Sequence, residues 1–97
     1  MTAVFDALAV PPTAQEKGGV EIVRGVIVEG GLHISIRRAF DDPQAWGMVL
    51  ADIARHAARI HALETGAAES QTLDRIRSML EAELDTPSDL GSTHAIS

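Results

Sequence analysis

Two runs of β-branched residues on either side of a Gly-Gly pair constrain the fold more than any other feature of this chain. Residues 20–29 read VEIVRGVIVE, residues 32–37 read LHISIR, and Gly30 and Gly31 stand between them. Glycine tolerates the positive φ angles of a primed two-residue turn. The pattern therefore predicts an antiparallel β-hairpin over residues 20–38.

The two predicted strands differ in how polar and apolar residues are distributed over their two faces. In the second strand, polar residues alternate strictly with the apolar residues Leu32, Ile34 and Ile36. This alternation predicts one buried face and one polar face. The first strand is apolar on both sides, so more than one helical layer should cover it. A turn formed by the two glycines alone would place Ile27 opposite Ile34 and Arg24 opposite Arg37.

A long helix is predicted directly after the hairpin, over residues 43–64. Asp42 can accept the free amide protons of its first turn, and Pro43 suits the first helical position. Gly66 is the expected left-handed cap at its end. One arc of this helix carries bulky residues, which suits a sheet. The adjacent strip carries only small residues, which lets another helix approach closely: Gly47, Ala51, Ala54 and Ala58.

A second helix is predicted from about residue 68 or 70 to residue 84, and Pro87 stops it. The whole chain then divides into an extended arm over residues 1–19, a single domain over residues 20–84 and a flexible tail over residues 85–97. The predicted fold class is α+β, in which an N-terminal arm precedes an antiparallel hairpin and two helices pack on that hairpin.

The predicted core is small for an independent domain. Alanine is the commonest of the apolar residues, and the aromatic residues are two Phe and one Trp. A core of this size rarely supplies more than about 3–5 kcal/mol, and an isolated hairpin is marginal without further strands or a partner face. We therefore expect a homo-oligomer, most simply a homodimer, that completes the sheet and covers the small-residue strip.

Composition excludes several functions. The formal net charge is −6 and there is no cysteine, which argues against nucleic-acid binding, disulfides, thiolate metal sites and a cysteine nucleophile. No apolar run is long enough to span a membrane, and the first residues do not resemble a signal peptide, so a cytoplasmic location is expected. Phosphate-loop, dinucleotide and hydrolase motifs are missing. We expect no cofactor and no metal, assign no catalytic residue and favour a protein that is not an enzyme.

One candidate binding site lies on the polar face of the hairpin. The predicted register brings Arg24 and Arg37 opposite each other, beside His33. Two facing guanidinium groups repel unless a carboxylate or phosphate lies between them, so these residues predict a small-anion site. The alternative is that acidic side chains of the tail or of a partner chain fill this place, or that both arginines reach water.

Further candidates lie on the long helix. Asp52 and His56 are four residues apart, a spacing that suits a metal site or acid–base chemistry. A metal site needs a third or fourth ligand, and the neighbouring sequence does not repeat the pattern. The alternative is an exposed pair of little energetic value. His61 falls on the apolar arc and is expected in the core. Trp46 is expected to anchor the helix to the sheet, with ligand stacking as its alternative role.

Three segments resemble a known family: the arm ALAVPP, the hairpin end GGLHIS and the helical run DPQAWGMVLADIARH. Together they are similar to a small bacterial domain of unknown function, number five thousand and seventy-six, over roughly residues 8–84. The resemblance implies no activity and no catalytic residues. It implies that Trp46-Gly47 and the stretch from Asp52 to His56 are a hallmark of the family. The expected function is a homo-oligomeric interaction or structural module, and the alternative is an anion-binding protein.

Overall fold

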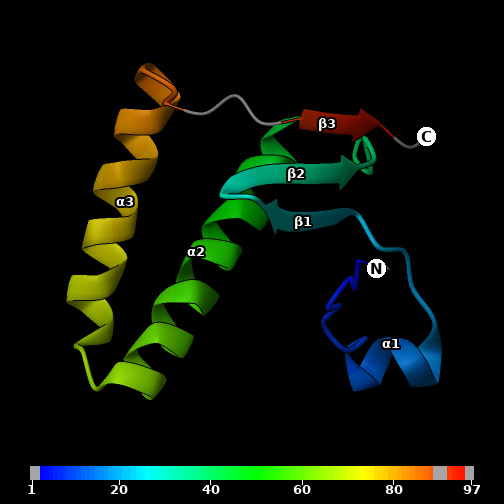
Figure 1. The fold of residues 1–97 in the computed structure, drawn as a ribbon, viewed down its shortest axis with the longest axis horizontal. Coiled ribbons are helices and arrows are strands. Elements are labelled where there is room, and N and C mark those ends of the chain that lie inside the picture. The colour runs from blue at the N-terminus through cyan, green and yellow to red at the C-terminus, as the bar shows by residue number, and fades with distance from the viewer. Residues whose placement is uncertain (1–2, 89–91, 96–97) are drawn as a thin grey trace.

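The chain folds into a three-stranded sheet, a pair of helices and an N-terminal arm beside the sheet (Figure 1). The computed structural model describes residues 3–88 and 92–95. It confirms the α+β class, with a hairpin followed by two helices. In chain order the elements are α1 (Pro12–Lys17), β1 (Val23–Val28), β2 (Gly31–Ile36), α2 (Gln44–Thr65), α3 (Glu69–Asp85) and β3 (Ser92–Ala95).

The central strand of the sheet is β2. It pairs with β1 in antiparallel orientation on one side and with β3 in parallel orientation on the other. The third strand lies inside the tail that the sequence predicted without regular structure. Ile34 pairs with Thr93 in this ladder, through backbone groups. Such pairing needs no apolar periodicity, so the local sequence gives little sign of it.

The hairpin turn lies one residue before its predicted position. Val28 pairs with Gly31, and the turn consists of Glu29 and Gly30. Their φ angles are 50° and 83°, the positive values that a primed turn requires at both central positions. Gly31 therefore belongs to β2 and not to the turn.

This displacement corrects the predicted register. Arg24 faces Ser35 and not Arg37, and Gly25 faces Ile34. A Cβ at residue 25 would lie 3.4 Å from the Leu32 side chain, an ordinary van der Waals contact. Each partner has moved by two positions. Since the side-chain period of a strand is two, every residue keeps its predicted face.

The arm differs from its predicted extended form at one place, the short helix α1. Proline is compatible with the first turn of a helix because its missing N–H has no helical acceptor there, so the helix can begin at Pro12. The Gln15 side-chain amide also donates to the Val10 carbonyl oxygen at 2.9 Å. The helix ends at Lys17, and Gly18 follows it as the cap with φ 78°.

The two long helices run side by side and pack on each other (Figure 1). The backbone N–H of Gln44 donates to Asp42 Oδ1 at 2.9 Å, as the sequence predicted. α3 covers the second half of the small-residue strip, where Ala58 is fully buried and Ala54 is half-buried, together with Ala62 one turn further on. Gly47 and Ala51 in the first half of the strip stay exposed. A second copy of the chain is expected on this strip, and α3 of the same chain takes part of that place.

Few side chains are buried within a single copy of the chain. Ala58 is the one residue of the described part that is fully buried. The accessible surface is 8459 Å² for a mass of 10.3 kDa, whereas a folded monomer of that mass exposes about 5,400 Å². Close backbone approaches join β1 to β2, β2 to β3 and α2 to α3. Among the described elements, neither long helix approaches the sheet as closely.

Two glycine substitutions in α2 should change stability in opposite directions. Gly66 caps α2 with φ 78° and ψ 3°, so Gly66→Ala is expected to lower the free energy of unfolding by about 1 kcal/mol. A Cβ at Gly47 meets nothing within 4 Å, so Gly47→Ala should raise it by about 0.5–1 kcal/mol. Urea unfolding at one fixed protein concentration measures both. Equal effects of the same sign would contradict the assigned cap.

Candidate functional site

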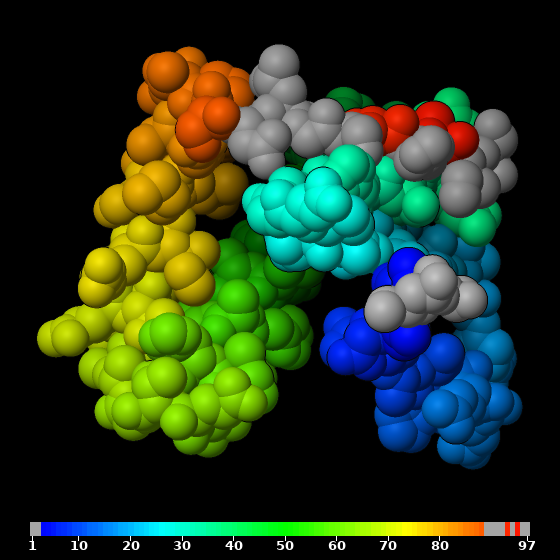
Figure 2. All heavy atoms as spheres, in the orientation of Figure 1, coloured from blue at the N-terminus to red at the C-terminus, as the bar shows by residue number. Residues whose placement is uncertain are grey.

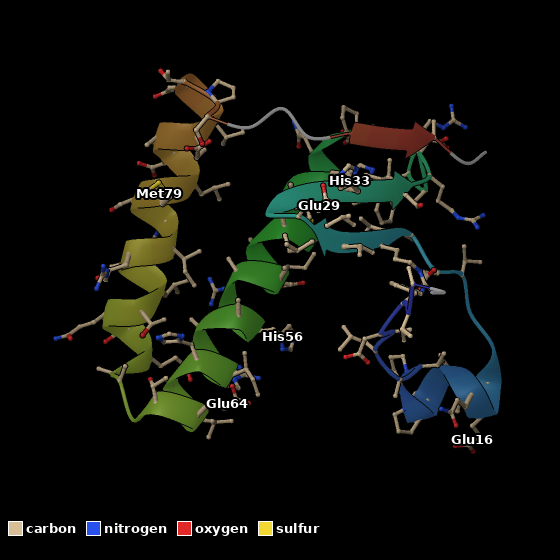
Figure 3. All side chains as sticks on the ribbon, in the orientation of Figure 1. Glu16, Glu29, His33, His56, Glu64 and Met79 are labelled. Atoms are coloured by element: carbon tan, nitrogen blue, oxygen red, sulfur yellow. The ribbon has the colours of Figure 1, made fainter. Side chains whose placement is uncertain are left out.

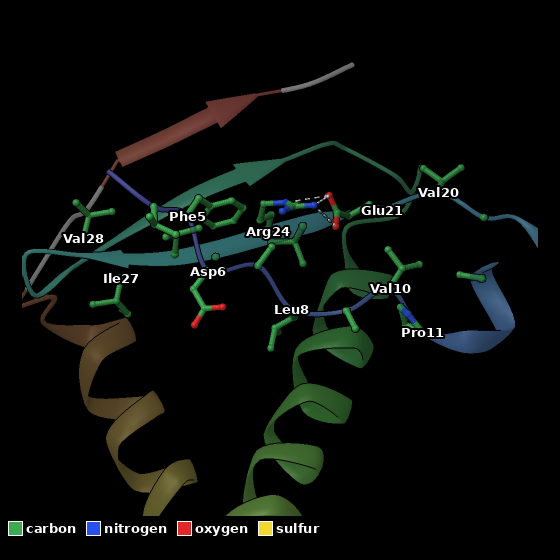
Figure 4. A pocket seen from close by; sticks show the side chains of 18 of the residues that line it. Phe5, Asp6, Leu8, Val10, Pro11, Val20, Glu21, Arg24, Ile27 and Val28 are labelled. Atoms are coloured by element: carbon green, nitrogen blue, oxygen red, sulfur yellow. Dashed lines mark hydrogen bonds and ion pairs between the residues drawn. The ribbon is translucent and has the colours of Figure 1, made fainter. Parts of the chain in front are cut away.

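A large hollow lies between the arm and β1 (Figure 4). It has a volume of about 1220 Å³, and its walls come from residues 4–11 of the arm and from β1 with its flanking residues. Leu8 in the arm is 97% exposed and Ile27 in β1 is 68% exposed. The hollow is therefore an open apolar surface and not an enclosed binding pocket.

Arg24 connects the arm to β1 inside this hollow. Its Nη2 donates to both carboxylate oxygens of Glu21 at 3.1 and 3.0 Å, and its Nε donates to Oε1 at 3.2 Å. The guanidinium carbon lies 5.4 Å from the centroid of the Phe5 ring, a cation–π distance. Figure 4 shows the Phe5 ring, the guanidinium group and the Glu21 carboxylate in one row along the strand. The arginine is thus held by an acidic side chain of its own strand segment.

The predicted anion site has a different geometry from the one expected. Arg37 also reaches Glu21, since its Nε donates to the Glu21 backbone oxygen at 2.9 Å. Glu21 therefore contacts both arginines, Arg24 through its carboxylate and Arg37 through its backbone oxygen, and it belongs neither to the tail nor to a partner chain, the two sources of acidic side chains that the sequence suggested. His33 lies on the central strand, and its register partner on β1 is Val26. Binding of an external anion stays a prediction, with the Glu21 carboxylate as its competitor.

Asp52 and His56 are both exposed on α2. No hydrogen bond or ion pair joins them among the interactions of residues 3–88. The described part of the chain also contains no group of three or more His, Cys, Asp or Glu residues that could hold a metal ion. Figure 3 shows the His56 side chain pointing away from α2, on the side of the arm. The arrangement matches the predicted alternative of an exposed pair.

A second, shallower hollow lies on this same face of α2. Its volume is about 450 Å³, and its walls come from α2 alone: Ile53, His56, Ala57, Arg59, Ile60 and Leu63. Ile60 is 53% exposed and Leu63 is 76% exposed. The bulky arc of the helix, which the sequence assigned to the sheet, is thus left open along its second half.

Trp46 connects the helix to the end of the hairpin. Its Nε1 donates to the Arg38 carbonyl oxygen at 2.8 Å, and its ring meets the Phe40 ring edge to face, with centroids 5.7 Å apart and planes at 78°. Both contacts are made to the segment between β2 and α2. Trp46 is expected to anchor the helix to the sheet, whereas these two contacts join it to the connecting segment and not to a strand.

His61 is the clearest error among the predicted positions. It was expected in the core, but its side chain is exposed. Its carbonyl oxygen accepts a hydrogen bond from the Thr65 hydroxyl at 2.8 Å. Leu50, Ile53 and Ile60 on the same apolar arc are also exposed, so membership of the arc did not imply burial. His94 lies in β3, and nothing further was predicted of it.

Sequence reasoning missed the hollow between the arm and β1 and the contacts that Glu21 makes there. The sequence predicts an extended arm over residues 1–19 and gives it no contact with the hairpin. The contact between Phe5 and Arg24 joins residues nineteen positions apart, and no periodic pattern indicates a pairing of that kind. The proximity of Glu21 to Arg24, at a spacing of three, was the one available signal.

Comparisons with known proteins identify a family but no activity. The model of a domain of unknown function, DUF5076, matches residues 7–88. A solved structure from the photosynthetic bacterium Rhodopseudomonas palustrus is 39% identical, with a TM-score of 0.76, and the match covers 99% of this chain and 100% of that one. That protein is provisionally described as a pyruvate dehydrogenase. The comparison with curated proteins gives no match.

Proposed function

This chain belongs to the DUF5076 family, and we propose that it acts as a homo-oligomeric interaction module whose apolar surfaces are covered by further copies of itself. A dimer is the simplest such assembly. The family has no assigned activity, so the proposal comes from the surface of the chain itself.

The observation that carries the proposal is the shortage of buried side chains. Only Ala58 is fully buried among the described residues, while large apolar side chains are widely exposed. The surface exceeds that of a folded monomer of this mass by about 3,000 Å². Obligate homodimers bury about 2,000–5,000 Å² in total and are more apolar than transient interfaces. Two copies together carry twice this excess, about 6,000 Å², so an interface at the upper end of that range would remove most of it.

The description of the structural relative receives no support from the described residues of this chain. Dehydrogenation of a 2-oxo acid relies on a cofactor as electron sink, and the protein must enclose and orient it. The larger hollow is open, and its charged side chains are Asp6, Glu21, Arg24 and Glu29, of which Arg24 is already paired. These residues do not form a set that would hold an anionic cofactor.

The proposed module is compatible with a cytoplasmic location, which stays a prediction. None of the described helices combines the length and the apolar character needed to cross a membrane.

Sedimentation equilibrium at micromolar concentration tests the proposed function. We expect an apparent mass of at least twice 10.3 kDa, with dissociation only on strong dilution. A single species of 10.3 kDa throughout the micromolar range would contradict the proposal.

A further inference from the structure

The arm hollow and the exposed face of α2 are two unpartnered apolar surfaces of one chain. Figure 2 shows the arm and the lower part of α2 on either side of an open space below the strands. Figure 4 shows that Leu8 of the arm and Ile27 of β1 project on the same side of the hollow. Both surfaces thus border the same space, and a second copy could meet both at once.

The exposed face of α2 has the spacing of a helix-packing seam. Alternating steps of three and four residues connect Trp46, Val49, Ile53, His56, Ile60 and Leu63. This spacing keeps the side chains on one stripe that faces a neighbouring element. The first two members of this series, Trp46 and Val49, are half-buried. The apolar side chains from Ile53 to Leu63 are exposed. That stretch is about 15 Å long at 1.5 Å per residue. We call the exposed members of the series the α2 seam: Ile53, His56, Ile60 and Leu63.

Charge favours contact between the α2 seam and the arm hollow. The shallower hollow along the α2 seam is lined by two titratable residues, His56 and Arg59. The arm hollow contains Asp6 and Glu29 in addition to the paired Glu21 and Arg24. An apolar stripe edged by a guanidinium group would therefore meet an apolar hollow edged by carboxylates. Such complementarity favours this pairing over contact between two arm hollows, which would bring carboxylates together.

From these observations we propose that the α2 seam of one copy occupies the arm hollow of a second copy. This inference rests on the proposed homo-oligomer and assigns its contact surface. In a two-fold dimer the contact occurs twice, because each chain supplies one seam and one hollow. The arm then reaches across its partner's helix, which explains why Leu8 is 97% exposed in a single chain.

The absence of cysteine from the sequence allows a specific cross-linking experiment. Two single-cysteine variants, Leu8→Cys and Ile60→Cys, are purified separately, mixed, equilibrated and treated with a short thiol-to-thiol cross-linker. Any mixed product must join two different chains. The matched control mixes Leu8→Cys with Ser78→Cys, because Ser78 is equally exposed but lies on α3. Sedimentation of each mixture measures the oligomeric state in parallel.

We expect the Leu8–Ile60 product to exceed the Leu8–Ser78 product at least about tenfold, as for groups held together in a complex compared with groups that meet by chance. A dimeric mass with equal yields of both products would overturn the assigned surface while leaving the homo-oligomer in place. A monomeric mass with neither product would overturn both the surface and the proposed function.

A pair of aspartate substitutions provides a second, independent readout. Ile60→Asp places a charge in the α2 seam and should weaken association by about tenfold or more. Met79→Asp is the matched control, since Met79 is a similarly exposed apolar residue on α3 at 62%. It should leave association unchanged. Equal weakening by both substitutions would contradict the inference.

Discussion

Replacing Trp46 by alanine is expected to lower the free energy of unfolding by about 2–3 kcal/mol. The substitution removes the edge-to-face contact with Phe40 and the hydrogen bond from Nε1 to the Arg38 carbonyl. These two contacts tie the start of α2 to the segment that follows β2. Since the long helices make no other close backbone approach to the sheet among the described elements, losing this tie should also loosen the sheet. Urea unfolding followed by circular dichroism measures the change.

Trp46→Phe is the matched control because it keeps an aromatic ring and removes the indole donor. We expect a loss of about 1 kcal/mol, the usual net value of one hydrogen bond. If Trp46→Phe were as destabilising as Trp46→Ala, the hydrogen bond alone would explain the effect. If both substitutions were neutral, Trp46 would not be the anchor described here.

Replacing Ala58 by leucine is the second large expected effect. Ala58 is 0% exposed at the contact between α2 and α3. A larger side chain there must push the helices apart, and overpacking of this kind usually costs about 1–3 kcal/mol. The loss should appear in urea unfolding at a fixed protein concentration, with reduced protection of α3 amides from hydrogen exchange.

Ala82→Leu tests whether the effect of Ala58→Leu comes from its position. Ala82 lies on α3 and is exposed, so a leucine there should change stability by no more than about 0.5 kcal/mol. A neutral Ala58→Leu would show that α3 does not pack on the small-residue strip in solution.

Local patterns predicted the parts of this fold that depend on local physics. The alternation of Leu32, Ile34 and Ile36 assigned the faces of β2, and Asp42 and Gly66 marked the ends of α2. The turn position was ambiguous because Glu29 can also adopt a positive φ, and a hairpin with the turn one residue earlier keeps all side chains on their faces. Periodicity alone could not separate the two registers.

The remaining features depend on contacts between distant residues. Pairing of β3 with β2 uses backbone groups, so residues 92–95 need no distinctive side chains. The small-residue strip correctly indicated a close helix, but the sequence did not show whether that helix belonged to the same chain. The sequence likewise did not show whether the acidic partner of the arginines belonged to the same chain. In the structure this partner is Glu21, which contacts both Arg24 and Arg37.

The central claim is that one copy of this chain cannot hold its fold without another, and the dependence of unfolding on protein concentration tests it most directly. Circular dichroism melts over a wide dilution series should show a Tm that rises with concentration, because association stabilises only the folded state. Helical signal and oligomeric mass should be lost together at the lowest concentrations. A monomer that keeps its full helical signal and melts at one temperature across the series would contradict the claim.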